Sequence, residues 1–206
     1  MKVYVYVDGF NLYYGCLKGT SFKWLNIRRL SELLFPKHTI TQIKYFTAPV
    51  KIRNSDSDRD KPNRQQIYLR ALRTLPGVDI IYGSFLTHVV TMKEADQNKY
   101  VRVIKTEEKG TDVNIASHLI NDGYKGLYEM AIVISNDSDL VEPVRMVKEE
   151  LGLPVVVVSP YKTNTIELKK IATFVKQLRS GILGVSQFSD MLMDEVGVFR
   201  RPENWN

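Results

Sequence analysis

Two kinds of hydrophobic pattern alternate along the chain. Apolar, β-rich runs that end at turn residues predict strands, whereas apolar residues spaced three or four positions apart predict helices. The runs typical of strands are KVYVYV (2–7), TITQIKYFTAPV (39–50), VDIIYGSF (78–85), EMAIVIS (129–135) and PVVVVSP (154–160). The segments typical of helices are NIRRLSELLF (26–35), RQQIYLRALRTL (64–75), TDVNIASHLINDG (111–123), DLVEPVRMVKEELG (139–152) and TIELKKIATFVKQL (165–178).

This alternation predicts an α/β fold with a mostly parallel sheet that is covered by helices on both faces. We therefore expect one domain with a Rossmann-like architecture. THVVTM (87–92) and KYVRVIKT (99–106) interrupt the alternation and predict a β-hairpin or meander. The tail from residue 181 to residue 206 has no clear pattern. It is either a partner-binding or dimer-contacting segment or a poorly ordered end.

Composition narrows the classes of function. The 206 residues suit one domain with a full core, and the formal net charge of +6 favours a polyanionic partner, most simply nucleic acid. Cys16 is the single cysteine and the three histidines are scattered, which argues against a disulfide framework and a zinc site. The N-terminal apolar run is too short for a signal peptide, and no segment is long enough to span a membrane. We expect a soluble, cytoplasmic protein.

Four aspartates are expected at one edge of the sheet. Asp8 directly follows the first predicted strand, Asp137 and Asp139 follow AIVIS, and Asp112 opens the helix after EEKG. Ligands of an open parallel sheet bind outside the carboxyl ends of its strands. Two unit charges about 4 Å apart repel by roughly 4 kcal/mol at an effective dielectric constant near 20. A carboxylate cluster there predicts Mg²⁺ or Mn²⁺, hard cations that prefer oxygen ligands.

Helix capping is the alternative for each of these side chains. Asp139 and Glu142 fit the capping box D-x-x-E, Thr111 or Asp112 would cap the helix that follows EEKG, and Asp8 before a glycine would be a turn residue. Capping leaves Asp137 unexplained, however, and gives no reason why every cap falls on one predicted edge. The joint pattern therefore favours a metal site.

The segments VYVDGFNLYYG, KGTDVNIASHLI and IVISNDSDLVEPVR resemble the NYN domain family, including its LabA-like members, which are related to PIN-domain nucleases. The three motifs occur in order, and the resemblance runs from about Met1 to Val175. It implies an NYN domain over residues 1–180 with a PIN-like three-layer α/β/α sandwich. It also implies a metal-dependent ribonuclease or a close relative of one.

The resemblance also implies roles for single residues. It marks as catalytic Asp8, Asn11, Asp112, Asp137 and Asp139, of which the four aspartates would hold one or two Mg²⁺ or Mn²⁺ ions for hydrolysis of an RNA phosphodiester. Asn11 would orient a water molecule or contact the phosphate. Many relatives have SGDSDF where this chain has SNDSDL, so Asn136 replaces a glycine in the turn and no carboxylate is lost.

Substrate contacts are expected from Ser135, Lys109, Arg53 and Arg64. Ser135 would hydrogen-bond a carboxylate or a metal-bound water, with a plain turn role as its alternative. Lys109 would touch a phosphate unless it is simply solvated. Arg53 and Arg64 belong to the basic segment 51–73, whose interspersed aspartates make a solvated loop the alternative. Phosphate contacts of this kind weaken steeply with salt.

Aromatic side chains near the first motif are candidates for stacking on unpaired bases. Tyr13 and Tyr14 come just after Asn11, and Phe22 and Trp24 follow. Packing in the core is the alternative for one of the tyrosines and for both Phe22 and Trp24.

Three functions remain open. A ribonuclease uses the whole set of motifs. An RNA- or nucleotide-binding regulator would keep the fold and the charge without turnover, but it has no use for a costly cluster of anions. A phosphatase with a nucleophilic aspartate after the first strand usually needs D-x-D, whereas Phe10 stands at the second position. The chain lacks G-x-G-x-x-G and a Walker A loop, which disfavours dinucleotide binding. PIN-like relatives often pair, so a homodimer also remains open.

Overall fold

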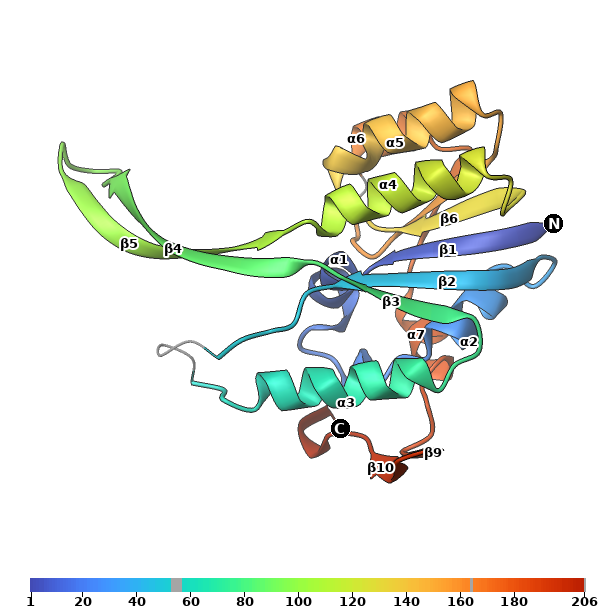
Figure 1. Ribbon diagram of the computed structural model, residues 1–206, viewed down its shortest axis with the longest axis horizontal. Coiled ribbons are helices and arrows are strands. Elements are labelled where there is room, and N and C mark those ends of the chain that lie inside the picture. The colour runs from blue at the N-terminus through green and yellow to red at the C-terminus, as the bar shows by residue number, and fades with distance from the viewer. Residues whose placement is uncertain (53–56, 164, 206) are drawn as a thin grey trace.

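The computed structural model describes residues 1–52, 57–163 and 165–205, and a six-stranded sheet lies at its centre (Figure 1). Every neighbouring pair of strands in this sheet is parallel, as the sequence predicts. The strand order is β3 (Val78–Tyr82), β2 (Thr39–Thr47), β1 (Lys2–Asp8), β6 (Met130–Ile134), β7 (Val155–Ser159) and β8 (Phe174–Gln177). The chain moves outward from β1 to β3 and then outward again from β6 to β8, so the topological switch point lies between β1 and β6.

Helices cover both faces of the sheet (Figure 1). One apolar core joins the sheet to α2 (Ile27–Leu34), α3 (Lys61–Arg73) and α7 (Ser180–Val185). The other joins it to α4 (Thr111–Tyr124), α5 (Val141–Arg145) and α6 (Ile166–Ile171). The strands β6 and β7 are buried along their whole length, which explains their unbroken apolar sequence. The predicted α/β/α sandwich is confirmed.

Local sequence accounts for where α2 begins and ends. The side chain of Asn26 accepts a hydrogen bond of 2.9 Å from the backbone N–H of Arg29 and caps the helix. Ile27, Leu30 and Leu34 are buried at helical spacing. The helix ends just before Pro36, which cannot continue it.

The prediction of one helix over residues 165–178 is wrong in its second half. Helix α6 ends at Ile171, and residues 174–177 form the edge strand β8 beside β7. Thr173 donates its backbone N–H to the carbonyl of Val155, and Val175 lies opposite Val157 in the register. The sequence TFV contains β-branched and aromatic residues, which fit a sheet better than a helix once a strand edge is available.

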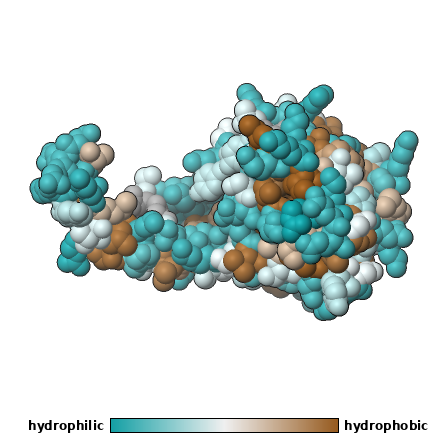
Figure 2. Space-filling view, turned by 90° about the horizontal axis from the view of Figure 1, so that it is seen from above, coloured by the Kyte–Doolittle hydropathy of each residue, from teal (hydrophilic) through white to brown (hydrophobic). Residues whose placement is uncertain are grey.

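The predicted hairpin is confirmed and forms a separate two-stranded arm. Strands β4 (Ser84–Lys93) and β5 (Tyr100–Lys109) pair antiparallel over their whole length. The arm projects from the body of the molecule, carries apolar side chains along its length and ends in a hydrophilic tip (Figures 1 and 2). At its base, the ring of Phe85 packs edge-on against Phe10, with the centroids 5.6 Å apart. The arm therefore returns the chain to the carboxyl edge of the sheet immediately before α4.

The end of the chain folds back against α3. Strands β9 (Met191–Asp194) and β10 (Gly197–Arg200) form a small hairpin, and Arg70 of α3 holds it through two hydrogen bonds of 2.7 Å to Asp194. Trp205 packs against Trp24 and Tyr68. Trp24 is fully buried, so packing in the core is its role in this structure. Within the described ranges, no helix has the length and apolar character needed to cross a bilayer.

Candidate metal centre

Asp8 lies at the end of β1, where the strand passes into the short helix α1 (Gly9–Leu12). Its carboxylate accepts hydrogen bonds from the backbone N–H of Asn11 (2.9 Å) and from the hydroxyl of Ser135 (3.0 Å). Helix α1 begins so close to β2 that a Cβ atom on Gly9 would lie 2.7 Å from the carbonyl oxygen of Phe46. Glycine is therefore needed directly after Asp8. The side chain is held rigidly, and only 4% of the residue is exposed.

The loop after β6 is tied to the same point. The side-chain oxygen of Asn11 accepts a hydrogen bond of 2.9 Å from the backbone N–H of Asn136. The hydroxyl of Ser135 accepts one of 3.1 Å from the N–H of Asp137. These bonds join the carboxyl ends of β1 and β6, which flank the switch point of the sheet. They place the Asp137 side chain beside Asp8.

Asp112 reaches this edge from the base of the arm. Gly110 has a φ angle of +94°, a left-handed conformation that favours glycine, and it turns the chain from β5 into α4. Glu108 accepts hydrogen bonds from the backbone N–H and the hydroxyl of Thr111, which satisfies donors in the first turn of the helix. Asp112 lies in that first turn and projects toward the other two aspartates.

Asp8, Asp112 and Asp137 each offer a carboxylate oxygen, and these oxygens lie within 4.8 Å of one another. Burial raises the pKa of Asp8 to about 6; hydrogen bonds from Asn11 and Ser135 oppose this rise, and the two neighbouring carboxylates add to it. Burial likewise raises the pKa of Asp112 to about 6, helped by the negative charges of Asp137, Glu108 and Asp139. Burial is the larger cause of both shifts, and the nearby anions add to it.

The donor set fits a hard divalent cation. In the part of the chain that the structure describes, no ion pair joins a Lys or Arg to any of the three clustered carboxylates. All the clustered atoms are oxygens, which suits Mg²⁺ or Mn²⁺ better than a thiolate- or imidazole-seeking metal. A buried carboxylate with an uncompensated charge is costly, and a cation at this point would remove the cost.

A cavity of about 300 Å³ opens over the cluster. Its lining includes two residues that sequence reasoning missed, Glu108 and Tyr161. Tyr161 follows the carboxyl end of β7, so the rule that selects Asp8 and Asp137 would also have found it. Glu108 precedes the glycine turn into α4, and its position depends on the hairpin register, which the sequence pattern does not specify.

The structure also places the remaining predicted residues of the site. Asp139 is exposed and contributes no atom to the group of three, although its charge raises the pKa of Asp112. Ser135 is fully buried, and its hydroxyl contacts Asp8. The Asn11 side chain lines the cavity while its oxygen holds the loop after β6.

Of the three cations predicted to bind substrate, Lys109 and Arg64 lie farther from the cluster. Lys109 pairs with Glu107 at 3.4 Å, and its side chain is exposed. Arg64 is largely buried and pairs with Asp58 and Asp60. Arg53 lies outside the described residues.

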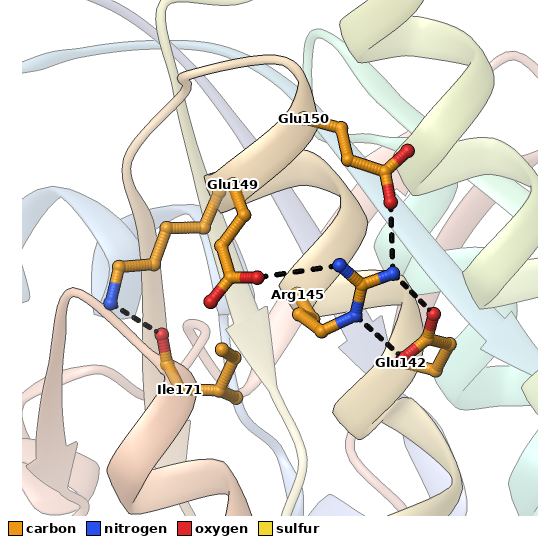
Figure 3. Close-up of polar contacts among 6 residues, drawn as sticks. Glu142, Arg145, Glu149, Glu150 and Ile171 are labelled. Atoms are coloured by element: carbon orange, nitrogen blue, oxygen red, sulfur yellow. Dashed lines mark hydrogen bonds and ion pairs between the residues drawn. The ribbon is translucent and has the colours of Figure 1, made fainter.

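The capping box expected for Asp139 and Glu142 does not form. Asp137, and not Asp139, caps the turn, because its carboxylate accepts a hydrogen bond of 3.0 Å from the N–H of Asp139. Glu142 instead binds Arg145, which also contacts Glu149 and Glu150 (Figure 3). Capping therefore does explain Asp137, but it uses one carboxylate oxygen and leaves the side chain within the cluster.

Asn136, at the position of a glycine in many relatives, forms a second tether. Its amide nitrogen donates to the carbonyl of Thr163 (3.1 Å), and its side-chain oxygen accepts from the N–H of Thr165 (2.8 Å). The hydroxyl of Thr165 donates to the carbonyl of Asn136 (2.6 Å). The loops after β6 and β7 are thereby joined beside the cluster.

A second cavity, of about 520 Å³, adjoins the first and shares Phe10, Tyr14 and Phe85 with it. It lies between the start of the chain, α3 and the C-terminal segment. Tyr68 of α3 and Trp205 form part of its apolar wall, and several lysine side chains surround it.

Comparisons with known proteins bear on this geometry. The chain is 27% identical over 237 aligned residues to the 6-hydroxy-3-succinoylpyridine 3-monooxygenase HspA of Pseudomonas putida (strain DSM 28022 / S16), and the alignment covers 100% of this chain and 75% of that protein. The fold of this chain is similar to the crystal structure of a protein of unknown function from Vibrio parahaemolyticus RIMD 2210633. The TM-score is 0.56, and the two chains are 16% identical over 87% of this chain and 93% of the other.

A family model extends the comparison to the three motifs. The model of the NYN domain, a nuclease-type fold, matches residues 2–178, a range that includes the three clustered aspartates and the whole six-stranded sheet. The chain therefore belongs to the NYN domain family.

Proposed function

We propose that this protein is a divalent-metal-dependent ribonuclease that hydrolyses RNA phosphodiester bonds. The observation that carries the proposal is the group formed by Asp8, Asp112 and Asp137, whose oxygens lie within 4.8 Å of one another at the switch point of an NYN domain. NYN nucleases generally depend on a divalent metal and act on RNA. The formal net charge of +6 suits a polyanionic substrate.

The three clustered aspartates would hold Mg²⁺ or Mn²⁺. When bound, such an ion lowers the pKa of a coordinated water and stabilises negative charge on the attacked phosphate. Ser135 and the backbone N–H of Asn11 favour the ionised form of Asp8, because both donate hydrogen bonds to it and so oppose the rise of its pKa. Asp139 stands exposed beside the group, where it would bind a second ion or a metal-bound water.

Positive side chains around the cavities would bind the RNA backbone. Lys109 lies at the base of the arm, two residues before the helix that carries Asp112. Arg64 lines the second cavity and would exchange its contacts with Asp58 and Asp60 for a phosphate. Arg53 belongs to the same basic segment. We place the protein in the cytoplasm, where it would meet RNA.

The decisive experiment is cleavage of a mixed RNA pool in Mn²⁺, Mg²⁺ or EDTA. The wild type should cut only with metal, and Asp137→Asn should lose cleavage by a factor of about 10² or more while keeping its fold, since asparagine retains an oxygen for the cap but not the charge. Asp96→Asn, in the exposed turn of the arm, is the matched control and should cut normally.

Two outcomes would overturn the proposal. Full activity in Asp137→Asn would show that the cutting does not use this group. RNA binding without cleavage under any metal would favour the alternative function, an RNA- or nucleotide-binding regulator.

A second candidate is oxygenation of a small heteroaromatic acid. The monooxygenase relative aligns with the whole chain, including the segment beyond residue 178 that the NYN model does not match. The specific observation in its favour is the cavity of about 520 Å³, which has aromatic walls and lysines around it, beside the carboxylates. The test is O₂ uptake with a hydroxypyridine carboxylate and an added two-electron reductant, in which one oxygen atom enters the ring and the other is reduced to water. Uptake that depends on the pyridine would support this candidate over the nuclease.

A further inference from the structure

The second cavity combines three features that suit a small planar anion. Its volume of about 520 Å³ is within the range of small-molecule sites. Aromatic rings form much of its wall, and among the residues that the structure describes its lining includes five cationic side chains and one carboxylate, that of Asp58. The cavity of the carboxylate cluster adjoins it through Phe10, Tyr14 and Phe85, which line both.

The C-terminal segment is part of this cavity. Asn204 and Trp205 line it, although they lie beyond the residues matched by the NYN model. Trp205 is held by ring contacts to Trp24 and Tyr68, and Lys23 donates a hydrogen bond of 3.4 Å to the carbonyl of Asn204. The wall that this segment supplies is therefore fixed in the folded protein.

The outer part of the cavity carries exposed aromatic and cationic groups, whereas buried aromatic rings line its inner part. Tyr14 is 56% exposed at the junction of the two cavities, and Lys18 lies over its ring at 5.0 Å from the centroid. Tyr68 and Tyr45, both nearly buried, form the apolar interior. A planar ring would find stacking partners here, and an anionic group on that ring would find lysines at the rim.

We infer that this cavity binds the base and a phosphate of the nucleotide next to the scissile bond. The inference rests on the proposed function, because it takes the clustered aspartates as the point of cleavage. A base in the second cavity leaves its neighbouring phosphodiester at the junction, where Phe10 and Tyr14 also line the carboxylate cavity. Stacking reads the planar face of a base and is tolerant of sequence, so this pocket selects unpaired RNA over duplex.

The test is isothermal titration calorimetry of the full chain with 5′-AMP in EDTA, where no cleavage occurs. Adenosine supplies the base and ribose without the phosphate, and ribose 5-phosphate supplies the phosphate and ribose without the base. Each of these two ligands should bind at least about tenfold more weakly than 5′-AMP if the cavity contacts both the base and the phosphate. Added salt should weaken the binding of 5′-AMP more than the binding of adenosine, since only the phosphate contacts the lysines.

Paired variants locate the binding. Tyr14→Ala should weaken the binding of 5′-AMP about tenfold, whereas Tyr124→Ala, which removes another exposed tyrosine from the far end of α4, should not. Lys18→Ala should weaken the binding of 5′-AMP several-fold but leave the affinity for adenosine unchanged. Lys125→Ala, at an exposed position remote from the cavity, should affect neither ligand.

The outcomes separate this inference from the proposed function. Binding of 5′-AMP that responds to Tyr14 and Lys18, in a protein that never cuts RNA, would keep the cavity assignment and reject the nuclease. Equal affinities for 5′-AMP and ribose 5-phosphate, or binding unchanged by Tyr14→Ala, would overturn the cavity assignment. Pyridine-3-carboxylate binding in preference to 5′-AMP would also overturn it and would support the oxygenation candidate.

Discussion

Two carboxylates, Asp8 and Asp122, are almost equally buried but have neighbours of opposite charge. Asp8 is 4% exposed and Asp122 is 3% exposed. Asp122 contacts the Lys44 ammonium at 2.5 Å and the Tyr6 hydroxyl at 2.8 Å. Within the described part of the chain, Asp8 accepts hydrogen bonds from two uncharged donors, and the charged groups that raise its pKa are two further aspartates. Burial alone therefore does not distinguish an acid in a cluster of carboxylates from an acid in an internal ion pair.

Strand β1 and helix α4 contribute residues to the surroundings of both Asp8 and Asp122. Tyr6 and Asp8 lie two positions apart on β1, so they point to the same face of the sheet, against which α4 packs. Helix α4 brings Asp112 at its start to Asp8 and Asp122 near its end to Tyr6. At one end the protein supplies the countercharge itself, through Lys44. At the other it supplies more negative charge, which is the arrangement expected where a cation binds.

The largest effect on stability should come from removing the internal countercharge. Lys44→Met should lower the free energy of unfolding by about 3–5 kcal/mol, because it leaves Asp122 buried without its partner. Urea unfolding at pH 7 measures the loss, and Lys125→Met serves as a control at an exposed position. Cleavage per folded molecule should be unchanged. A stability equal to that of the wild type would contradict the view that this pair is structural.

The second effect is a pH dependence of the free energy of unfolding that arises from the clustered aspartates. The pKa of Asp8 is raised in the folded protein to about 6 from the ordinary value of 3.8, so the folded state holds the proton more tightly than the unfolded state. Its contribution therefore favours folding below about pH 4 and is lost as the pH rises through about 6. A shift of this size corresponds to about 3 kcal/mol, and Asp112 adds to it in the same direction.

Asp8→Asn isolates this contribution. In EDTA, the wild type should become less stable relative to Asp8→Asn as the pH rises from 4.5 to 7.5, because the variant cannot ionise. Urea unfolding of both proteins at several pH values measures the difference, in which charges that do not interact with Asp8 cancel. A difference that stays constant with pH would show that Asp8 is not destabilised by its charge.

The third effect is the reversal of that destabilisation by metal. Mn²⁺ at about 100 times its dissociation constant should raise the free energy of unfolding by about 2.7 kcal/mol at neutral pH. The gain should shrink near pH 5, where protons compete for the same carboxylates. Lys44→Met should retain the gain, because its defect lies elsewhere, whereas Asp8→Asn should lose it. Equal stabilisation of both variants by Mn²⁺ would place the metal outside the cluster.

Much of the fold and part of the site follow from sequence alone, for a physical reason. Apolar runs followed by turn residues mark strand ends, and parallel strands bring their carboxyl ends to one edge, which is enough to predict the meeting of Asp8 and Asp137. The pairing of Asp122 with Lys44 is not predictable in this way, since it depends on the rotation of α4 over β1 and β2. The position of Glu108 depends on hairpin register, and that of Trp205 on how the tail packs.

The smallest effect should come from the tether beside the cluster. Asn136→Gly restores the residue of many relatives but removes the hydrogen bonds to the carbonyl of Thr163 and the N–H of Thr165. The loss should be about 1–2 kcal/mol of unfolding free energy, since each bond contributes about 1 kcal/mol and glycine loosens the turn. Asp8 and Asp137 keep their own hydrogen bonds, so the response to Mn²⁺ should survive with a weaker affinity. Titration of Mn²⁺ against thermal stability measures that affinity. An unchanged affinity would show that the loops after β6 and β7 are positioned without Asn136, and that the cluster depends only on the bonds between β1 and β6.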